Sequence, residues 1–262
     1  MKKELRASSS NFLSQKVWRQ LRKIVGKKIW TNLYIISQKT KLPKKIEELS
    51  KSDLGLKRNL EYPAINKNEK ITNEGKKFSE YLKNYNTSKP GGIYREFLDR
   101  LFFTIRPKTK TILELGISKG GGLLSMRDFF EKSYLWGVDI DKDTFVDSER
   151  IVKCDWADQL KTKTLKKNAE NFNTKFDLIV DDGWHHPESQ INSLISYLPY
   201  LSQKGTYIVE DIVHYHYSKY FKKVVKILED KGFEVNYKNF DIKESEISDN
   251  LGYLIVSRKQ TN

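Results

Sequence analysis

The sequence predicts a mostly parallel α/β domain of seven strands, preceded by a basic helical segment. Three observations lead to this prediction. From Lys110 onward, short apolar runs alternate with helical patterns, which is typical of a parallel sheet covered by helices on both faces. Acidic residues and histidines gather where the apolar runs end, and the excess positive charge is confined to the N-terminal part of the chain.

The composition is that of a globular protein. The chain has 262 residues, of which 38% are hydrophobic, so one full domain with an appendage fits the length. The single cysteine, Cys154, excludes an intramolecular disulfide framework and fits a reducing compartment. No apolar run reaches the roughly 18 residues that span a bilayer. Residues 29–36 form a short apolar run without a small-residue cleavage site after it, so we expect a cytoplasmic protein.

The N-terminal segment carries most of the charge. Residues 1–60 hold 16 Lys and Arg against four Asp and Glu, a balance of +12, which leaves +2 for the other 202 residues. Apolar residues recur at helical spacing from Val17 to Leu33, with basic residues between them. Such a helix packs on its own domain, pairs with a second copy of the chain in a homo-oligomer, or lies on an anionic membrane surface at the inner membrane face. Nucleic acid is disfavoured, because the rest of the chain shows no basic stripe and no known binding module.

Residues 38–75 are rich in Lys, Asn and Glu and contain two prolines, which favours a linker or a loosely packed subdomain. We therefore divide the chain into a basic helical extension with its linker, residues 1–75, and a folded domain, residues 76–262.

Within the domain, helical patterns cover residues 78–85 and 93–105, the second closed by Pro107. The predicted strands are 111–116, 134–141, 150–155, 176–183, 206–212, 233–240 and 251–258. The predicted helices between them are 121–130, 159–171, 187–201 and 218–232. No crossover helix fits between the last two strands, so the last strand should pair antiparallel.

Polar residues follow each of the first five strands, and the carboxyl ends of parallel strands meet at one edge, where open α/β sheets bind ligands. In chain order these residues are Glu114, Asp139, Asp141, Asp155, Asp158, Asp181, Asp182, His185, His186, Glu210, Asp211, His214 and His216. All four histidines of the chain are among them. The sequence therefore predicts a site at this edge.

A glycine loop, residues 116–122, follows the first strand. Its spacing differs from the G-x-G-x-x-G pattern of dinucleotide folds, which disfavours a nicotinamide-dependent oxidoreductase. Glu114, two residues before Gly116, would repel a pyrophosphate and favour a cationic ammonium or sulfonium centre. Asp139, at the end of the second strand, is placed to accept hydrogen bonds from ribose hydroxyls.

Four segments carry a family resemblance: "LELGISKGGGLLSMRDFF", "WGVDID", "FDLIVDDGWHH" and "GTYIVEDI". In this order and spacing they resemble class I S-adenosylmethionine-dependent methyltransferases, and more narrowly the metal-dependent sugar O-methyltransferases of macrolide biosynthesis. The resemblance covers about residues 85–258. It implies a Rossmann-like class I methyltransferase fold and transfer of a methyl group to a hydroxyl of a sugar, nucleotide-sugar or glycan acceptor.

The resemblance also implies roles for individual residues. Asp182, Glu210 and Asp211 match the family's ligands for Mg²⁺ (or Mn²⁺), and His185 matches its general base. For S-adenosyl-L-methionine it implies Glu114 and Gly116 near the methionine part, Asp139 on the ribose and Asp155 near the adenine. Gly120 belongs to the same cofactor loop.

The chemistry of these residue types agrees with the resemblance. Three carboxylates are hard oxygen ligands suited to Mg²⁺, whereas a closed zinc site prefers Cys and His. A divalent ion lowers the pKa of a coordinated hydroxyl, and a neutral imidazole then accepts its proton.

Several points stay open at this stage. Asp181 is interpreted as a structural acid, His186 has no assigned role, and the sequence does not choose between His214 and His216. Trp184 stands where the family has a small residue. The alternatives to an O-methyltransferase are a non-catalytic cofactor-binding module and a hydroxylase-like relative of the same fold.

Overall fold

The computed structural model of the chain describes residues 41–56, 75–85, 87, 93–212, 215–240 and 251–259. The chain divides into two units, Met1–Lys44 and Lys45–Asn262, and the sheet belongs to the second. The basic helix expected over residues 17–33 and His214 lie outside the described residues, as does the side chain of His216. Among the described helices, none combines the length and apolarity needed to cross a membrane. The division at residue 75 stays a prediction.

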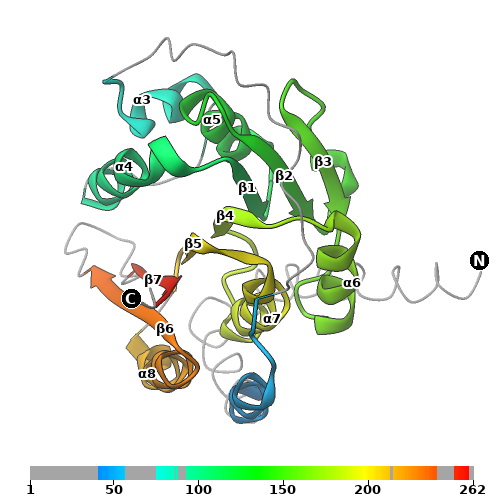
Figure 1. Ribbon diagram of the computed structural model, residues 1–262, viewed down its shortest axis with the longest axis vertical. Coiled ribbons are helices and arrows are strands. Elements are labelled where there is room, and N and C mark those ends of the chain that lie inside the picture. Colours follow the sequence, from blue (N-terminus) through cyan, green and yellow to red (C-terminus); the bar gives the residue numbers. More distant parts are fainter. Residues whose placement is uncertain are drawn as a thin grey trace, which may run out of the picture. The chain divides into compact units, whose positions relative to one another are not determined.

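The second unit contains one seven-stranded sheet in the order β3-β2-β1-β4-β5-β7-β6 (Figure 1). Six strands run parallel, and β7 pairs antiparallel with both β5 and β6, so the predicted fold class is confirmed. The strands are β1 Thr111–Leu115, β2 Tyr134–Asp139, β3 Ile151–Trp156, β4 Phe176–Asp181, β5 Leu201–Val209, β6 Phe233–Phe240 and β7 Leu251–Arg258.

Helices cover both faces of the sheet (Figure 1). One face carries α3 Phe78–Leu82, α4 Ile93–Ile105 and α5 Gly121–Phe129, and the other carries α6 Thr162–Phe172, α7 Pro187–Tyr197 and α8 Tyr215–Asp230. Edge-to-face aromatic contacts join the first group: the ring of Phe78 lies 4.7 Å from that of Phe102, and the rings of Phe129 and Phe130 are 4.9 Å apart. Such pairs add to the free energy of burying apolar area.

Several element boundaries differ from the sequence prediction: β5 begins at Leu201 rather than at residue 206, and α8 begins at Tyr215 rather than at residue 218. Two further differences have local reasons. Helix α6 begins at Thr162 rather than at residue 159, because Asp158 accepts a hydrogen bond from the backbone N–H of Leu160 and holds a loop there. Helix α7 ends at Tyr197, and a 3₁₀ turn, Leu198–Tyr200, leads directly into β5. Pro199 in that turn has no N–H with which to continue the α-helix.

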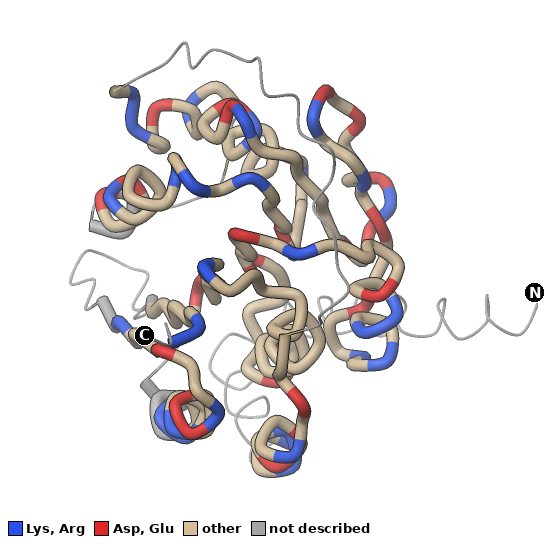
Figure 2. Tube along the Cα trace, viewed as in Figure 1, with Lys and Arg blue, Asp and Glu red and all other residues tan. Residues whose placement is uncertain are grey.

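Basic and acidic residues are interspersed along the described elements (Figure 2). This mixture agrees with the near balance of charge after residue 60. The part of the chain that the structure describes therefore gives no support for a single-sign electrostatic surface of the kind that binds polyanions.

Arg258, at the end of β7, ties three segments of the second unit together. Its guanidinium donates to the carbonyl oxygens of Leu198 at 2.8 Å, Leu201 at 3.2 Å and Leu54 at 3.3 Å. It also lies over the ring of Phe233, 5.1 Å from the ring centroid. Residues just after the helical stretch 41–51 are thereby fastened to the sheet.

Replacing Arg258 by methionine keeps an unbranched apolar side chain but leaves three carbonyl groups without their donor. We expect the free energy of unfolding to fall by about 2–4 kcal/mol, which lowers Tm by roughly 5–10 °C for a domain of this size. Lys259→Met, at the exposed neighbouring position, is the control and should leave Tm within about 1 °C. Equal Tm values for the two variants, measured by calorimetry, would contradict this role.

Candidate functional site at the carboxyl edge of the sheet

The site lies where the strand order reverses, between β1 and β4. Backbone hydrogen bonds extend the sheet beyond the strand ends at this point. The N–H of Gly116 donates to Val138 at 2.7 Å, the N–H of Asp182 to Leu115 at 2.9 Å, and the N–H of Glu210 to Asp181 at 2.9 Å. These bonds fix the starting points of three neighbouring loops, in the crevice where open α/β sheets bind ligands.

The glycine loop and the β4–α7 turn are in direct backbone contact. Gly116 has φ +91°, and a Cβ at this position would overlap the Cα of Gly183 and lie 2.6 Å from the carbonyl oxygen of Asp182. Gly120 has φ +79° and is the N-cap of α5. Glycine is required at Gly116 both for its conformation and for this close approach. The predicted cofactor loop is therefore held against the predicted metal-binding turn.

Two of the predicted cofactor residues border this loop. Glu114 is 1% exposed, and its carboxylate lies where a Cβ on Gly122 would be, at the first turn of α5. Asp139 accepts hydrogen bonds from the backbone N–H groups of Ser118 and Asp141, both at 2.9 Å. A carboxylate oxygen accepts more than one hydrogen bond, so Asp139 keeps acceptor capacity toward a ligand.

Asp155, the third acid of the predicted cofactor set, lies within β3, one residue before its end. Its side chain forms a 2.9 Å ion pair with Lys153 and accepts a 2.8 Å hydrogen bond from the N–H of Trp156. The structure thus orders Asp155 by local contacts at the same edge of the sheet, beside β2.

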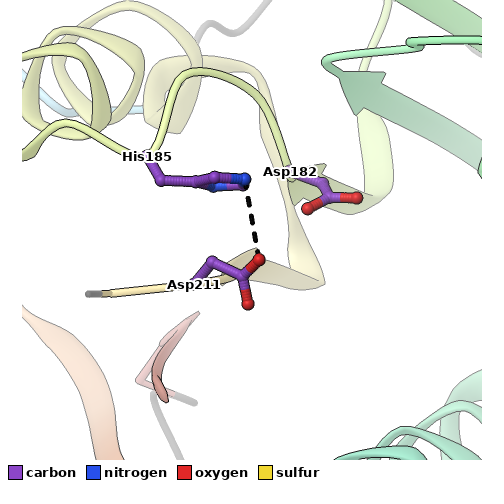
Figure 3. A group of neighbouring side chains, drawn as sticks. All are labelled: Asp182, His185 and Asp211. Carbon is purple, nitrogen blue, oxygen red and sulfur yellow. Dashed lines mark ion pairs between the residues drawn. The ribbon is translucent and has the colours of Figure 1, made fainter. Parts of the chain in front are cut away.

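Asp182, His185 and Asp211 form the group best suited to a metal ion among the described residues (Figure 3). Each offers one ligand atom, and these atoms lie within 4.8 Å of one another. The Nε2 of His185 is 3.6 Å from the Oδ2 of Asp211, and the two side chains are 37% and 20% exposed. Cis ligands of Mg²⁺ lie about 3 Å apart, from its coordination distance of 2.0–2.1 Å. The two carboxylates, which face partly into solvent, therefore fit a divalent ion together with water ligands, and the imidazole beside them is placed to act either as a further ligand or as a base.

Glu210, the remaining predicted metal ligand, is placed differently. It is 0% exposed, and it is not in the group of Asp182, His185 and Asp211. Its carbonyl oxygen accepts a 3.0 Å hydrogen bond from the Nε2 of Gln190 on α7. Glu210 therefore lies beneath the group, at the end of β5, rather than at its solvent side.

Asp211 has an unusual backbone conformation. Its φ is +49°, in the left-handed region that non-glycine residues rarely adopt. The next residue, Ile212, donates its N–H to Gly252 of β7 at 2.9 Å, which holds the chain in this turn. A local cost of about 1–3 kcal/mol is typical of such residues, and they cluster at functional sites.

Asp181 is buried, and the sequence interpretation of it as a structural acid agrees with its contacts. It is 1% exposed, and its Oδ1 accepts a 2.8 Å hydrogen bond from the Nε2 of Gln159. Burial raises the pKa of Asp181 from its ordinary value of 3.8 to about 7; the hydrogen bond from Gln159 opposes this rise and the charge of Asp182 adds to it.

Gln159 was missed by sequence reasoning, although it contacts the core of the site. It follows β3 at the same edge of the sheet as the other polar residues, next to Asp158. Its position at the carboxyl edge was thus a usable signal, but among the polar side chains only charged residues and histidines were predicted for the site, and Gln159 is an uncharged amide.

Trp184 and His186 lie together in the β4–α7 turn. Their ring centroids are 4.8 Å apart, and His186 is the N-cap residue of α7, with Pro187 at the first helical position. The predicted start of this helix at Pro187 is confirmed, because proline suits the position where no N–H partner is needed. Trp184 precedes His185 in the sequence, while its side chain contacts the ring of His186.

Comparisons with known proteins define the fold class. No protein-family model matches the chain. In the second unit, the sheet resembles that of the MycE methyltransferase from the mycinamycin biosynthetic pathway, solved in complex with Mg and SAH. That likeness has a TM-score of 0.55 and 22% identity, and it covers 70% of this chain and 55% of that one. The described domain has the Rossmann-like fold of class I methyltransferases.

Sequence comparison identifies curated proteins that are similar to this chain. The chain is 29% identical over 143 residues to demethylmacrocin O-methyltransferase from Streptomyces fradiae, covering 51% of this chain and 36% of that protein. It is 30% identical over 143 residues to mycinamicin VI 2''-O-methyltransferase from Micromonospora griseorubida, covering 51% of this chain and 35% of that protein. The chain thus spans about a third of the length of these curated relatives. The resemblance to macrolide sugar O-methyltransferases is confirmed.

Asparagine at position 181 would mimic the neutral, protonated carboxyl group. The folded-state pKa of Asp181, about 7, is above its ordinary value of 3.8, so the folded state binds more protons over this range and its stability falls as pH rises. In metal-free protein, Asp181→Asn should be about 4 kcal/mol more stable than wild type at pH 8, because each pKa unit corresponds to about 1.4 kcal/mol, with the difference vanishing near pH 4. Denaturant unfolding at several pH values measures this difference; a difference independent of pH would contradict the assignment.

Proposed function

We propose that this chain is an S-adenosylmethionine-dependent O-methyltransferase that acts on a sugar hydroxyl with the help of a divalent metal ion. The observation that carries the proposal is the grouping of Asp182, His185 and Asp211 within 4.8 Å, with Asp182 and His185 on a turn packed against Gly116 of the glycine loop. A cofactor loop and a metal-binding turn that touch each other suit a reaction between a bound cofactor and a metal-bound substrate.

The residues around the glycine loop fit S-adenosyl-L-methionine. The carboxylate of Glu114 lies beside the first turn of α5 and the glycine loop, where its negative charge attracts a cationic sulfonium centre and repels a phosphate. Gly116 and Gly120 have positive φ values that shape the cofactor loop, while Asp139 offers acceptors for ribose hydroxyls. Asp155 is the candidate for the adenine end.

The metal-binding turn fits Mg²⁺ or Mn²⁺. Asp182 and Asp211 supply partly exposed carboxylates, and Glu210 supplies a buried carboxylate directly before Asp211. When bound, the divalent ion lowers the pKa of the acceptor hydroxyl as a Lewis acid, and S-adenosyl-L-methionine provides the electrophilic methyl group.

The protein's own contribution to the chemistry is proton transfer and positioning. His185 accepts the proton of the acceptor hydroxyl at Nε2, and Asp211, with Oδ2 3.6 Å away, stabilises the resulting imidazolium. Trp184, whose ring is tilted against that of His186, lies in the same turn and supplies an apolar surface on which a sugar ring can rest. Close approach of the two loops keeps the reacting groups near each other.

The acceptor class follows from the relatives. The two curated relatives are named for methylation of macrolides, and one name specifies a 2''-hydroxyl. We propose a hydroxyl of a sugar, free, linked to a nucleotide, or part of a glycan, as the acceptor for this chain.

Cofactor binding is tested by calorimetry with S-adenosylhomocysteine. Asp139→Ala should weaken binding by about 10–100-fold, since hydrogen bonds to a charged group are worth about 1.5–3 kcal/mol. Asp230→Ala, at an exposed acid near the end of α8, is the matched control and should bind as wild type does. If wild-type protein fails to bind S-adenosylhomocysteine, the proposed function is wrong.

The two roles at the turn are separated by two substitutions. Asp182→Asn should lower Mn²⁺ affinity by about tenfold or more, as loss of a charged ligand does. His185→Ala should leave Mn²⁺ affinity unchanged and reduce methyl transfer about 100-fold. His186→Ala, at the N-cap of α7, is the control for histidine removal.

The assay uses labelled S-adenosyl-L-methionine with a panel of nucleotide sugars and cell-envelope glycans. Full transfer in excess chelator would show that the turn is structural. A lowered Mn²⁺ affinity in His185→Ala would make His185 a metal ligand instead of the base. Tight S-adenosylhomocysteine binding without transfer to any acceptor in the panel would favour a cofactor-binding module.

A further inference from the structure

The side chain of Gln159 spans the turn that carries Asp182 and His185. We infer that Gln159 is a positioning residue, which fixes this turn in the geometry that binds the divalent ion. The inference rests on the proposed function, because it concerns the metal-binding turn of that same site.

Gln159 itself is rigidly held. Its backbone carbonyl accepts a 2.9 Å hydrogen bond from Asn192, which is 0% exposed on α7. The residues on either side of Gln159 are also joined: the N–H of Leu160 donates to the carboxylate of Asp158 at 3.0 Å, and Asp158 is 2% exposed. The loop between β3 and α6 is therefore a fixed platform from which the amide reaches toward β4.

Every polar group of this amide is used on the neighbouring segment. The Nε2 donates to the Oδ1 of Asp181 at 2.8 Å and to the Oγ of Ser193 at 3.1 Å. The Oε1 accepts the backbone N–H of Trp184 at 2.6 Å. With two donors and one acceptor all engaged, only one side-chain orientation satisfies the site.

These bonds hold the β4–α7 turn at two points. Asp181 comes immediately before Asp182, and Trp184 comes immediately before His185, so Gln159 holds the residue preceding each of the two site residues. Between them, a Cβ on Gly183 would overlap the Oε1 of Gln159.

The opposite side of the turn is closed by Gly116, next to the carbonyl oxygen of Asp182. Asp182 is also fixed from behind by its N–H, which donates to Leu115 of β1 at 2.9 Å. The turn is thus held between the glycine loop and Gln159. Without the side-chain amide of Gln159, it would be held on the side of the glycine loop only.

The expected effect is on metal affinity more than on cofactor affinity. Partners that orient metal ligands typically contribute 10–100-fold to metal affinity. The glycine loop, by contrast, keeps its own hydrogen bonds at Gly116 and Ser118 when Gln159 is changed.

The test compares Gln159→Met with wild type. Methionine fills nearly the same volume and forms none of the three hydrogen bonds, so it separates packing from positioning. Titration calorimetry with Mn²⁺ should show about 10–100-fold weaker binding, while the Kd for S-adenosylhomocysteine should change by less than about threefold. Gln203→Met, at an exposed glutamine near the start of β5, is the matched control and should change neither value.

A second variant protects the test against misfolding. Gln159→Glu keeps an acceptor for the N–H of Trp184 but loses the donors to Asp181 and Ser193, and it should weaken Mn²⁺ binding as the methionine variant does. Ser193→Ala removes only the longest of the three bonds and should change Mn²⁺ affinity by less than about threefold. Circular dichroism and Tm establish that each variant is folded at the temperature of the titration.

The outcomes are distinguishable. Wild-type Mn²⁺ affinity in folded Gln159→Met and Gln159→Glu would overturn the positioning role and leave the proposed function intact. Equal losses of Mn²⁺ and S-adenosylhomocysteine affinity would also overturn it, because they would show a general disturbance. If wild-type protein binds S-adenosylhomocysteine but no Mn²⁺, the metal-dependent function is wrong, and the inference falls with it.

Discussion

The contact between Gly116 and the backbone of Asp182 and Gly183 is the constraint on which the site depends. It joins the loop after β1 to the turn after β4 at the point where the strand order reverses. This approach explains the glycine at position 116, where a Cβ would overlap the Cα of Gly183, whereas a Cβ at position 183 would meet the side chain of Gln159. Because of this contact, the proposed sites for the cofactor and the divalent ion are neighbours.

Charge is distributed around this contact according to depth. Asp181 and Glu210 are buried at the ends of β4 and β5, while Asp182 and Asp211, the residues that follow each of them, reach solvent. Burial raises the pKa of Asp181 to about 7, so one of the acids at this edge is held at least partly neutral near physiological pH. The partly exposed pair, Asp182 and Asp211, is the one that we propose for the divalent ion, which also keeps water ligands.

The turn at Asp211 shows how the sheet imposes an unfavourable conformation. Glu210 continues the ladder with β4, and Ile212 is bound to β7, so the single residue between them must change the direction of the chain. A left-handed φ of +49° results. The antiparallel strand β7 therefore has a role in the site, since its hydrogen bond holds Asp211 beside His185.

Much of this protein was determined by the sequence alone. Continuous apolar runs separated by helical patterns predicted seven strands with the last antiparallel, and the observed ranges of β6 and β7 match the prediction to the residue. The rule that parallel strands end at one edge was sufficient to expect Asp182, His185 and Asp211 together, because that rule needs only strand positions.

What only the tertiary structure decided was contact at the scale of single atoms. The sequence did not show that Glu210 would be fully buried while Asp211, the next residue, lies beside Asp182 and His185. It gave no sign that Gln159 would reach Asp181 and Trp184, 22 and 25 residues further along the chain. Strand periodicity determines the edge at which a residue lies, but the loops that follow the strands have no period. Their side-chain directions are fixed by hydrogen bonds between segments distant in sequence, which form only when the sheet is assembled.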